Sequence, residues 1–405
     1  MIQALRGMKD LLSPQSEKYI YFIENCSKIA KNYGYEYIET PILEETALFK
    51  RSVGESSDIV GKEMYQFTDK GGNDVCMRPE GTAGVVRAFI QQKYDRAGVQ
   101  KKFFYHGPMF RYERPQKGRL REFHQFGVES FNQADIREDA TIILMLKDML
   151  DLFGIGYKLE LNSLGCSDCM PAYREKLVNF LQNEDNICED CKRRRETNPI
   201  RVLDCKNKSC QDIYKNAPLL IDNLCSTCRD EMSTLQKILD SFEVAYTINP
   251  KLVRGLDYYN KTAFEFVSDG IGAQNAIAGG GRYDKLVEYL DGKPTSGIGF
   301  AMGIERLMDL IVMPKKHRAG YYIGALCDEA QEKCFELSIK MRKTEKASIN
   351  YDKKSLKAHL KNADKQNARY CICIGEDELA KDSVWIKDLE NKKEESISYR
   401  EFLGK

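Results

Sequence analysis

The 405-residue sequence has no long uninterrupted apolar stretch. A membrane-spanning helix needs about 20 consecutive apolar residues, and no segment approaches that length. The opening residues, MIQALRGMKDLL, also lack the apolar core and the small-residue cleavage site of a signal peptide. These absences argue against a membrane protein and a secreted one, so we expect a cytoplasmic protein.

The sequence also lacks an excess of charge of one sign, an internal repeat and a low-complexity tract. Its formal net charge is only +1, so any argument for nucleic-acid binding depends on local patches. Hydrophobic residues make up 42% of the chain and charged residues 30%, which is typical of a globular protein. The length predicts two to three domains.

Cysteine is abundant, and eight of the 14 cysteines lie between residues 166 and 228. In a long chain of cytosolic character, such clustering favours metal binding or reduced thiols over a disulfide scaffold. The spacing gives three CxxC pairs and one wider pair, which are Cys166/Cys169, Cys188/Cys191, Cys225/Cys228 and Cys205/Cys210. Four pairs can supply one or two structural zinc sites with four thiolates each, although unligated or redox-sensitive thiols remain alternatives.

Apolar periodicity predicts the elements before this cluster. Residues 15–34 form a helix ended by Gly34, and residues 35–43 form a strand in which Pro41 indicates a sheet edge or a subunit boundary. Residues 101–114 and 122–132 form a hairpin joined by a polar, basic loop. A helix over 136–153 and a strand over 158–165 complete this part.

Composition changes abruptly at residue 166, and we interpret residues 166–240 as an insertion rich in cysteine, lysine and arginine. Strand-like, glycine-rich segments return at 252–267, 277–286 and 296–311, the last of which ends in a helix. Residues 313–320 form a linker. Beyond it, strands and helices alternate, which predicts a small α/β domain with a largely parallel sheet.

Three segments carry chemistry. The hairpin combines arginines with Phe123, which suits an anionic ligand that contains a base, although a solvated charged turn is the alternative. The string RGLDYYN (254–260) places charges in a predicted strand, which a simple core strand would not contain. The run GGGRY (279–283) matches neither GxGxxG nor GxxxxGK[ST], and close backbone approach or a bulge explains it equally well.

Together these segments resemble class II aminoacyl-tRNA synthetases, and within that class the histidyl-tRNA synthetase family. The helix and strand at 15–43 with Pro41 are similar to motif 1, FRYE (110–113) through Phe123 to motif 2, and GIGFAMGIER (297–306) to motif 3. RPEGTAG (78–84), HQFGVE (124–129), RGLDYYN and AGGGRYD are similar to the histidyl-specific segments. The likeness is strong over residues 1–315 and looser beyond.

The resemblance implies a fold and domains. It implies a catalytic domain built on an antiparallel sheet with flanking helices, formed by residues 1–165 and 241–315. Residues 166–240 are then the Cys-rich insertion, and residues 321–405 are an α/β anticodon-binding domain. It also implies a homodimer with its interface at motif 1.

The resemblance further implies a two-step activity with ATP, Mg²⁺, L-histidine and histidine tRNA. Catalysis is assigned to Arg111, Arg254 and Arg306. The ATP-binding set is Arg111, Glu113, Arg119, Arg121, Phe123 and Arg306. The histidine-binding set is Glu80, Thr82, Arg111, Gln125, Glu129, Arg254, Tyr258, Tyr259 and Tyr283. Arg114 and Gln116 are expected near the tRNA acceptor end.

Two other interpretations remain. One is a non-catalytic paralogue, the histidine-sensing regulatory subunit of ATP phosphoribosyltransferase, but such paralogues generally lack the C-terminal domain and lose motif arginines. The other is a zinc-dependent nucleic-acid-binding protein with a vestigial core, which the intact set of Arg111, Arg254 and Arg306 disfavours. Any metal in the insertion is expected to be structural and remote from the active site.

Overall fold

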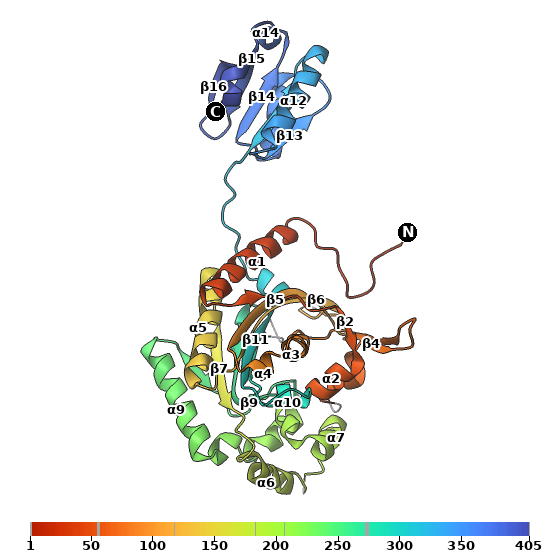
Figure 1. Ribbon diagram of the computed structural model, residues 1–405, viewed down its shortest axis with the longest axis vertical. Helices are drawn as coiled ribbons and strands as arrows, with labels where there is room; N and C mark the ends of the chain where they lie inside the picture. The colour runs from red at the N-terminus through yellow and green to blue at the C-terminus, as the bar shows by residue number, and fades with distance from the viewer. Residues whose placement is uncertain are drawn as a thin grey trace. The chain divides into compact units, whose positions relative to one another are not determined.

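The computed structural model describes residues 2–54, 57–116, 118–182, 184–205, 207–271 and 275–404. The chain divides into two compact units, residues 1–312 and 313–405 (Figure 1). Among the described residues, no helix is both long and apolar enough to cross a membrane.

The first unit is built around an eight-stranded sheet with the order β1-β5-β6-β11-β10-β9-β7-β8. The six central strands are antiparallel, and only the two outermost pairs, β1 with β5 and β7 with β8, are parallel. The strands are β1 (Glu36–Tyr37), β5 (Lys101–Phe110), β6 (Glu122–Phe131), β7 (Lys158–Ser163), β8 (Tyr246–Ile248), β9 (Asn260–Val267), β10 (Ala276–Arg282) and β11 (Gly297–Gly303). A second, three-stranded sheet contains β2 (Leu43–Glu45), β4 (Asp74–Met77) and β3 (Gln66–Thr68).

The two faces of the large sheet have different neighbours, as the alternation along β6 shows. Phe126 contacts Phe22 of α1 (Gln15–Asn32), and Ser130 donates to Glu138 of α5 (Ile136–Leu152). On the other face, Phe131 stacks on Phe89 of α3 (Thr82–Gln91). Helices α2 (Thr46–Val53) and α10 (Leu286–Tyr289) pack with α3. One face is therefore closed by two long helices, and the other is left to shorter helices and loops.

Most predicted elements of this unit are confirmed. The hairpin pairs Lys101 with Phe131 and Phe110 with Glu122, and the helices at 15–32 and 136–152 match the expected ones. The predicted strand at 35–43 is wrong in length. Glu36 and Tyr37 pair at the edge of the large sheet and Leu43 begins β2 of the small sheet, because the chain leaves the first ladder before Pro41, which cannot donate a hydrogen bond.

The strand predicted from residue 252 begins only at Asn260. Residues 252–259, which include Arg254 and both tyrosines, form an irregular loop before β9. The charges that made the string unusual for a core strand are the reason, because a buried ladder would leave them without partners.

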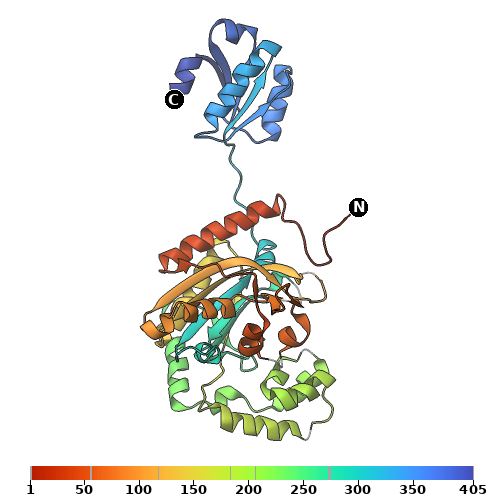
Figure 2. The same cartoon turned by 45° about the vertical axis from the view of Figure 1, so that its right-hand side comes forward.

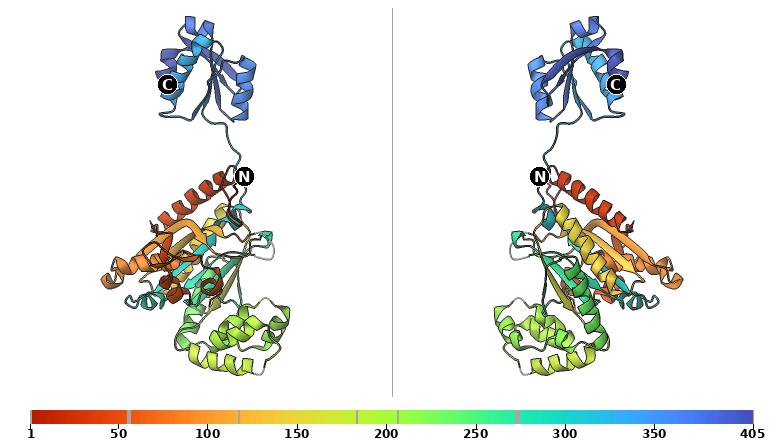
Figure 3. Two further views of the ribbon diagram at one scale, coloured as in Figure 1. Left: turned by 90° about the vertical axis from the view of Figure 1, so that its right-hand side faces the viewer. Right: turned by 90° about the vertical axis from the view of Figure 1, so that its left-hand side faces the viewer.

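The insertion is helical and lies at one end of the unit (Figure 2, yellow-green). Its elements are α6 (Met170–Gln182), α7 (Glu189–Thr197), η2 (Pro199–Asp204), α8 (Lys208–Ile213), η3 (Tyr214–Asn216), η4 (Leu220–Asn223) and α9 (Ser226–Ser241). They share an apolar cluster around Tyr173, Leu177, Val202 and Tyr214 that includes five of the cysteines. Helix α9 then packs against α5, as the right-hand view of Figure 3 shows.

The C-terminal unit has a five-stranded sheet with the order β13-β12-β14-β15-β16. Its elements are β12 (Tyr321–Ala325), η6 (Asp328–Ala330), α12 (Gln331–Met341), β13 (Ala347–Asn350), α13 (Leu356–Lys365), β14 (Tyr370–Ile374), α14 (Glu376–Ala380), β15 (Ser383–Asp388), β16 (Lys393–Ser398) and α15 (Tyr399–Gly404). The predicted largely parallel sheet is only half right. Strands β12 to β14 are parallel, but β15 and β16 add an antiparallel hairpin that the charged segment at 383–398 did not reveal.

Candidate active site

A cavity of about 250 Å³ opens on the sheet face that α1 and α5 do not cover. Its walls come from the end of β6, the loop over 111–121, the loop over 252–259, and strands β10 and β11. Eleven predicted site residues line it, namely Glu80, Thr82, Arg111, Glu113, Arg119, Phe123, Gln125, Arg254, Tyr258, Tyr259 and Arg306. Residues far apart in the sequence thus meet at one site.

Each of the three predicted catalytic arginines is held by the surrounding chain. Arg111 donates from Nε to the carbonyl of Pro79 at 2.9 Å and lies over the Phe123 ring. Arg306, near the start of α11 (Ile304–Met308), donates to the carbonyls of Gly118 at 2.9 Å and Ala276 at 2.6 Å. These bonds leave Nη2 of Arg306 and both terminal nitrogens of Arg111 for other partners, and they orient the side chains before any ligand binds.

Arg254 is held differently, by a carboxylate and by close approach to the sheet. Its Nη1 donates to Glu265 on β9 at 2.6 Å, and its guanidinium lies 5.7 Å from the Tyr259 ring centroid. Below it is Gly279 on β10, where an added Cβ would lie 2.3 Å from Nη1. The glycine run at 279–281 therefore lies in strand β10, where other groups approach its backbone closely, which is the close approach that the sequence left open.

The cavity is lined by many charged side chains, with equal numbers of arginines and carboxylates. Arg111, Arg119, Arg254 and Arg306 line it together with four carboxylates, from Glu80, Glu113, Glu265 and Glu305. Burial lowers the pKa of Arg306, and the positive charge of Arg119 lowers it further. Crowded guanidinium groups favour a ligand with negative charge.

Glu129 and Tyr283 lie beside the cavity, in the sheet beneath the tyrosines. Tyr283 donates to Glu129 Oε2 at 2.5 Å, and Tyr105 donates to Oε1 at 3.3 Å. The Glu129 side chain is 1% exposed, and burial raises its pKa to about 8, although the phenol of Tyr283 opposes that rise. A carboxyl group with such a pKa changes charge near neutral pH, which is typical of functional sites.

The charged atoms Glu113 Oε2 and Arg254 Nε are buried on the cavity wall without a hydrogen-bond partner among the described residues, and two uncharged polar atoms there are buried in the same way. The uncharged atoms are the phenol oxygen of Tyr258 and Oε1 of Gln125. Buried polar groups are nearly always paired in folded proteins, so two unpaired atoms on one cavity point to a polar ligand.

Glu80 and Thr82 stand at the start of α3. Glu80 is 3% exposed and accepts from the backbone of Thr82 at 2.7 Å and of Ala83 at 2.9 Å. Burial raises the pKa of Glu80, while the backbone donors act in the opposite direction. The carboxylate is thus fixed at the cavity wall by the helix that it caps.

Besides Glu129 and Tyr283, three predicted residues do not line the cavity. Arg121 donates to the carbonyl of Glu113 at 3.2 Å and stacks on Tyr112 with 3.7 Å between the guanidinium carbon and the ring centroid. Arg114 and Gln116 are exposed in the 111–121 loop, where Gln116 and Arg119 exchange backbone hydrogen bonds.

The sequence reasoning missed Glu265 and Glu305. Glu265 pairs with Arg254, and its signal was a single carboxylate within the apolar strand AFEFV. Glu305 accepts from the backbone of His124 at 2.9 Å and lies 2.8 Å from its Nδ1, which ties the start of α11 to β6. No sequence signal distinguished it from any other helix glutamate.

The eight clustered cysteines form two groups of four, a pairing that the sequence left open. Cys166, Cys169, Cys225 and Cys228 form one group, and Cys188, Cys191, Cys205 and Cys210 the other. Within each group all the sulfur atoms lie within 4.8 Å of one another, a geometry that can hold a metal ion.

Comparison with known proteins now decides the family. A family model for histidyl-tRNA synthetase matches residues 7–307, and one for an anticodon binding domain matches residues 309–405. The histidine–tRNA ligase of Sulfurimonas denitrificans is 63% identical over 398 residues, which cover 98% of this chain and 99% of that protein. The chain belongs to the histidyl-tRNA synthetase family. The histidine–tRNA ligase of Campylobacter hominis is 59% identical, covering 100% of this chain and 99% of that protein.

A solved structure of this family agrees with the fold. The apo histidyl-tRNA synthetase of Staphylococcus aureus superimposes with a TM-score of 0.85 at 33% identity, covering 100% of this chain and 99% of that one. The predicted family and the predicted class II fold with its anticodon-binding domain are confirmed.

Proposed function

We propose that this chain is a histidine–tRNA ligase that forms histidyl-adenylate from L-histidine and ATP and then transfers the histidine to the 3′ end of histidine tRNA. The observation that carries the proposal is the convergence of Arg111, Arg254 and Arg306 on one cavity that also holds the unpaired polar atoms of Tyr258 and Gln125. The catalytic role belongs to residues 1–165 and 241–315, and residues 321–405 bind the anticodon.

The arginines act where charge develops. A carboxylate oxygen of histidine attacks the α-phosphorus, the bond to the bridging oxygen breaks, and pyrophosphate leaves. Negative charge grows on the phosphoryl oxygens and on the leaving group. Arg111 and Arg254 lie on two sides of the cavity for the α-phosphate, and Arg306 serves the γ-phosphate. Fixed cations stabilise this transition state more than the ground state.

ATP and its metal have further partners. Phe123 offers a ring for the adenine, flanked by Arg111. Arg119 and Glu113, paired at 3.0 Å, complete this side, and Arg121 acts by supporting the loop. Carboxylates are the side chains that Mg²⁺ prefers, and those of Glu113 and Glu265 on the cavity wall fit an ion that arrives with the triphosphate.

Histidine occupies the deeper end. Glu80, Thr82 and Gln125 receive the α-ammonium group. Neutral imidazole has one donor and one acceptor, and the carboxyl of Glu129 with the phenols of Tyr258, Tyr259 and Tyr283 can satisfy both. An amino acid without these nitrogens would leave buried polar groups unpaired, which can cost about 10⁴-fold in discrimination.

The tRNA has two candidate contacts. Arg114 and Gln116 are exposed in the 111–121 loop and suit phosphate and base-edge contacts at the acceptor end. On α13, Lys357, Lys361 and Lys365 are exposed at intervals of four residues, which places them along one face of the helix. Such a row suits contact with the phosphate backbone of the anticodon stem.

The proposal includes a cytoplasmic homodimer and structural zinc in the insertion. The edge formed by α1, β1 and β2 exposes Ile20, Tyr37, Ile42 and Leu43, each more than two-fifths accessible. Apolar groups gathered at one edge are typical of a subunit interface. The two tetrads of cysteine supply four thiolates each for zinc.

The regulatory-paralogue alternative is not favoured, because the full-length relatives at 59–63% identity are histidine–tRNA ligases. The deciding experiment is histidine-dependent exchange of labelled pyrophosphate into ATP, followed by charging of histidine tRNA. Arg254→Ala should abolish exchange while ATP binding, measured by calorimetry, survives. Near-normal exchange by this variant would overturn the role of Arg254, and absence of exchange in the wild type would overturn the function.

A further inference from the structure

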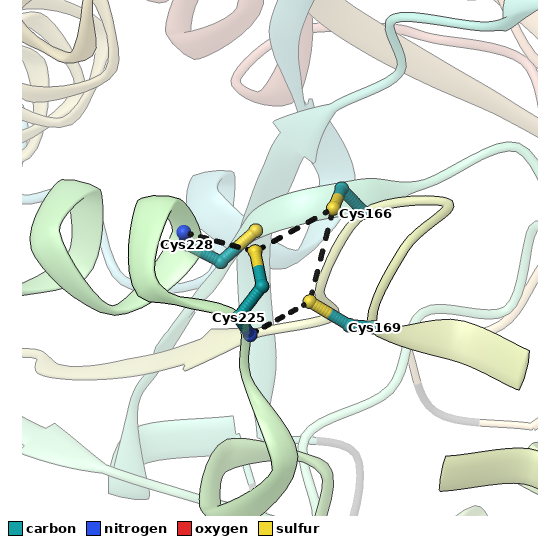
Figure 4. Close-up of side chains that lie close together, drawn as sticks. All are labelled: Cys166, Cys169, Cys225 and Cys228. Carbon is teal, nitrogen blue, oxygen red and sulfur yellow. Dashed lines mark hydrogen bonds between the residues drawn. The ribbon is translucent and has the colours of Figure 1, made fainter. Parts of the chain in front are cut away.

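The two cysteine tetrads have the dimensions of metal sites. Four sulfurs bonded to one zinc ion at about 2.3 Å in a tetrahedron lie about 3.8 Å apart. In the first tetrad, Cys166 lies 3.8 Å from Cys169 and 3.8 Å from Cys225, sulfur to sulfur (Figure 4). In the second, the sulfurs of Cys188 and Cys205 are also 3.8 Å apart. A disulfide requires about 2.05 Å, so these are not disulfide pairs.

The backbone around the sulfurs also suits thiolates. Cys169 Sγ accepts from the backbone N–H of Cys225 at 3.2 Å, and Cys210 Sγ accepts from that of Cys188 at 3.1 Å. The N–H of Asn207 points to Cys205 Sγ at 3.4 Å. Donors of this kind stabilise negative sulfur and orient metal ligands. Both tetrads therefore combine four ligands, tetrahedral spacing and a supporting shell.

Cysteines of the second tetrad lie at both ends of a segment that contacts the 252–259 loop of the active site. Cys191 lies on α7 and Cys205 directly follows η2, so a shared ion would pin both ends of the stretch between them. That stretch carries Asn198 and Arg201. Asn198 donates to Asp257 at 3.0 Å, and Arg201, 8% exposed, pairs with the same carboxylate at 2.9 Å.

These contacts hold the loop that bears Arg254. Residues 252–259 have no regular structure and so lack a ladder of their own. Arg201 also donates to the carbonyl of Gly255, next to Arg254, and Asp257 is anchored further by its N–H to the carbonyl of Val53 at 3.3 Å. The α7–η2 corner of the insertion thus forms part of the loop's support. The sequence predicted a structural metal remote from the active site; an ion in the second tetrad would be linked to the site through this corner.

We propose that the insertion binds two zinc ions, one in each tetrad, and that the ion held by Cys188, Cys191, Cys205 and Cys210 positions Arg254 through Arg201 and the 254–259 loop. Arg201 is a positioning residue. It does not line the cavity that holds the three catalytic arginines, but it binds the backbone next to Arg254. The metal binding stands by itself, whereas the coupling rests on the proposed function.

Metal content tests the first part. Full-length protein purified without added metal should contain two zinc ions per chain by elemental analysis. Cys166→Ser and Cys205→Ser should each contain one, and Cys327→Ser, a matched thiol in the other unit, should keep two. Cobalt-substituted protein should show the thiolate charge-transfer and tetrahedral bands of a tetrathiolate site. Fewer than two metal ions in the wild type, or iron in place of zinc, would overturn this part.

Arg201→Gln tests the coupling without disturbing any ligand. We expect this variant to keep two zinc ions and to melt within a few degrees of the wild type. Its kcat for pyrophosphate exchange should fall about 10-fold or more, and its KM for ATP should change less, because misplacement of a catalytic group acts on the transition state. Lys192→Gln, on the neighbouring helix α7 and paired with Glu189, should behave as the wild type. Full activity in Arg201→Gln would refute the coupling and leave both the zinc sites and the proposed function standing.

Discussion

The contact between Gly279 and Arg254 gives a quantitative test of how the site is built. In Gly279→Ala the new Cβ would lie 2.3 Å from Nη1 of Arg254 and 2.7 Å from its Cζ. Gly279 is fixed on both sides, opposite Glu265 of β9 and Ala301 of β11, so the strand cannot retreat. An ordinary contact needs at least 3.4 Å, so the guanidinium must move by about 1 Å.

A displacement of about 1 Å at a catalytic group costs on the order of 100-fold in rate. The kcat for pyrophosphate exchange in Gly279→Ala should therefore fall about 100-fold, while the KM values for ATP and histidine change less. The fold should survive, because the backbone there is extended and the atoms that must yield are the far end of a side chain. Steady-state exchange combined with a thermal melt separates the two effects.

The controls sharpen the result. Gly156→Ala adds a methyl group with nothing within 4 Å and should leave activity unchanged. If Gly279 acts through Arg254, Gly279→Ala should share the pattern of Arg254→Ala, which is a loss of exchange with ATP binding retained in calorimetry. Weakened ATP binding or near-normal exchange in Gly279→Ala would refute the reasoning.

Two pH-dependent predictions follow from buried groups. The pKa of Glu129 is about 8 in the folded protein and near 4.5 in an unfolded chain, so its neutral form favours folding below pH 4.5 and this stability is lost as the pH rises to about 8. As the pH rises from about 4.5 to about 8, Glu129→Gln should therefore gain stability relative to the wild type, by at most about 5 kcal/mol. Urea titrations measure the two free energies of unfolding, and a difference between them that stays constant from pH 5 to 8.5 would contradict the raised pKa. In the C-terminal unit, burial lowers the pKa of His359, whose Nε2 donates to the carbonyl of Ala325 at 2.9 Å and whose Nδ1 accepts from Tyr322 at 3.0 Å. The unit should lose stability as the pH falls below about 6.5, and His359→Gln should flatten that loss in thermal melts; equal pH profiles would argue against it.

The sequence predicted those site residues that lie in a recognisable local pattern. Alternation located β5 and β6, and a charged string within an apolar region marked Arg254. It could not place Glu265 or Glu305, because each is one glutamate whose partner is distant in the sequence. The short length of β1 before Pro41 and the hairpin of β15 and β16 were also not predicted. Whether a segment at the edge of a sheet pairs depends on the neighbouring strand, which apolar periodicity does not reveal.

The insertion shows the same limit more sharply. CxxC spacing identified the eight cysteines but left the pairing open, because the first tetrad joins Cys166/Cys169 to Cys225/Cys228 across both pairs of the second. The contact of Arg201 with Asp257 had no local signal, as both residues read as ordinary surface charges. Long-range ion pairs are chosen by the folded backbone, and only the structure reveals them.

The charge balance of the cavity gives a physical reason for Mg²⁺ to accompany ATP in the proposed reaction. Four guanidinium groups are already opposed by four carboxylates, and Arg254 and Arg119 are each engaged by one of them. A bare triphosphate would therefore enter a region with no net positive charge, beside the carboxylates of Glu113 and Glu265. Glu113 and Glu265 are the residues that would hold Mg²⁺, and the ion would supply positive charge beside the triphosphate while the guanidinium groups stay in place. The glutamates that pair with arginines, Glu265 with Arg254 and Glu113 with Arg119, are thus also the groups that would bind the ion.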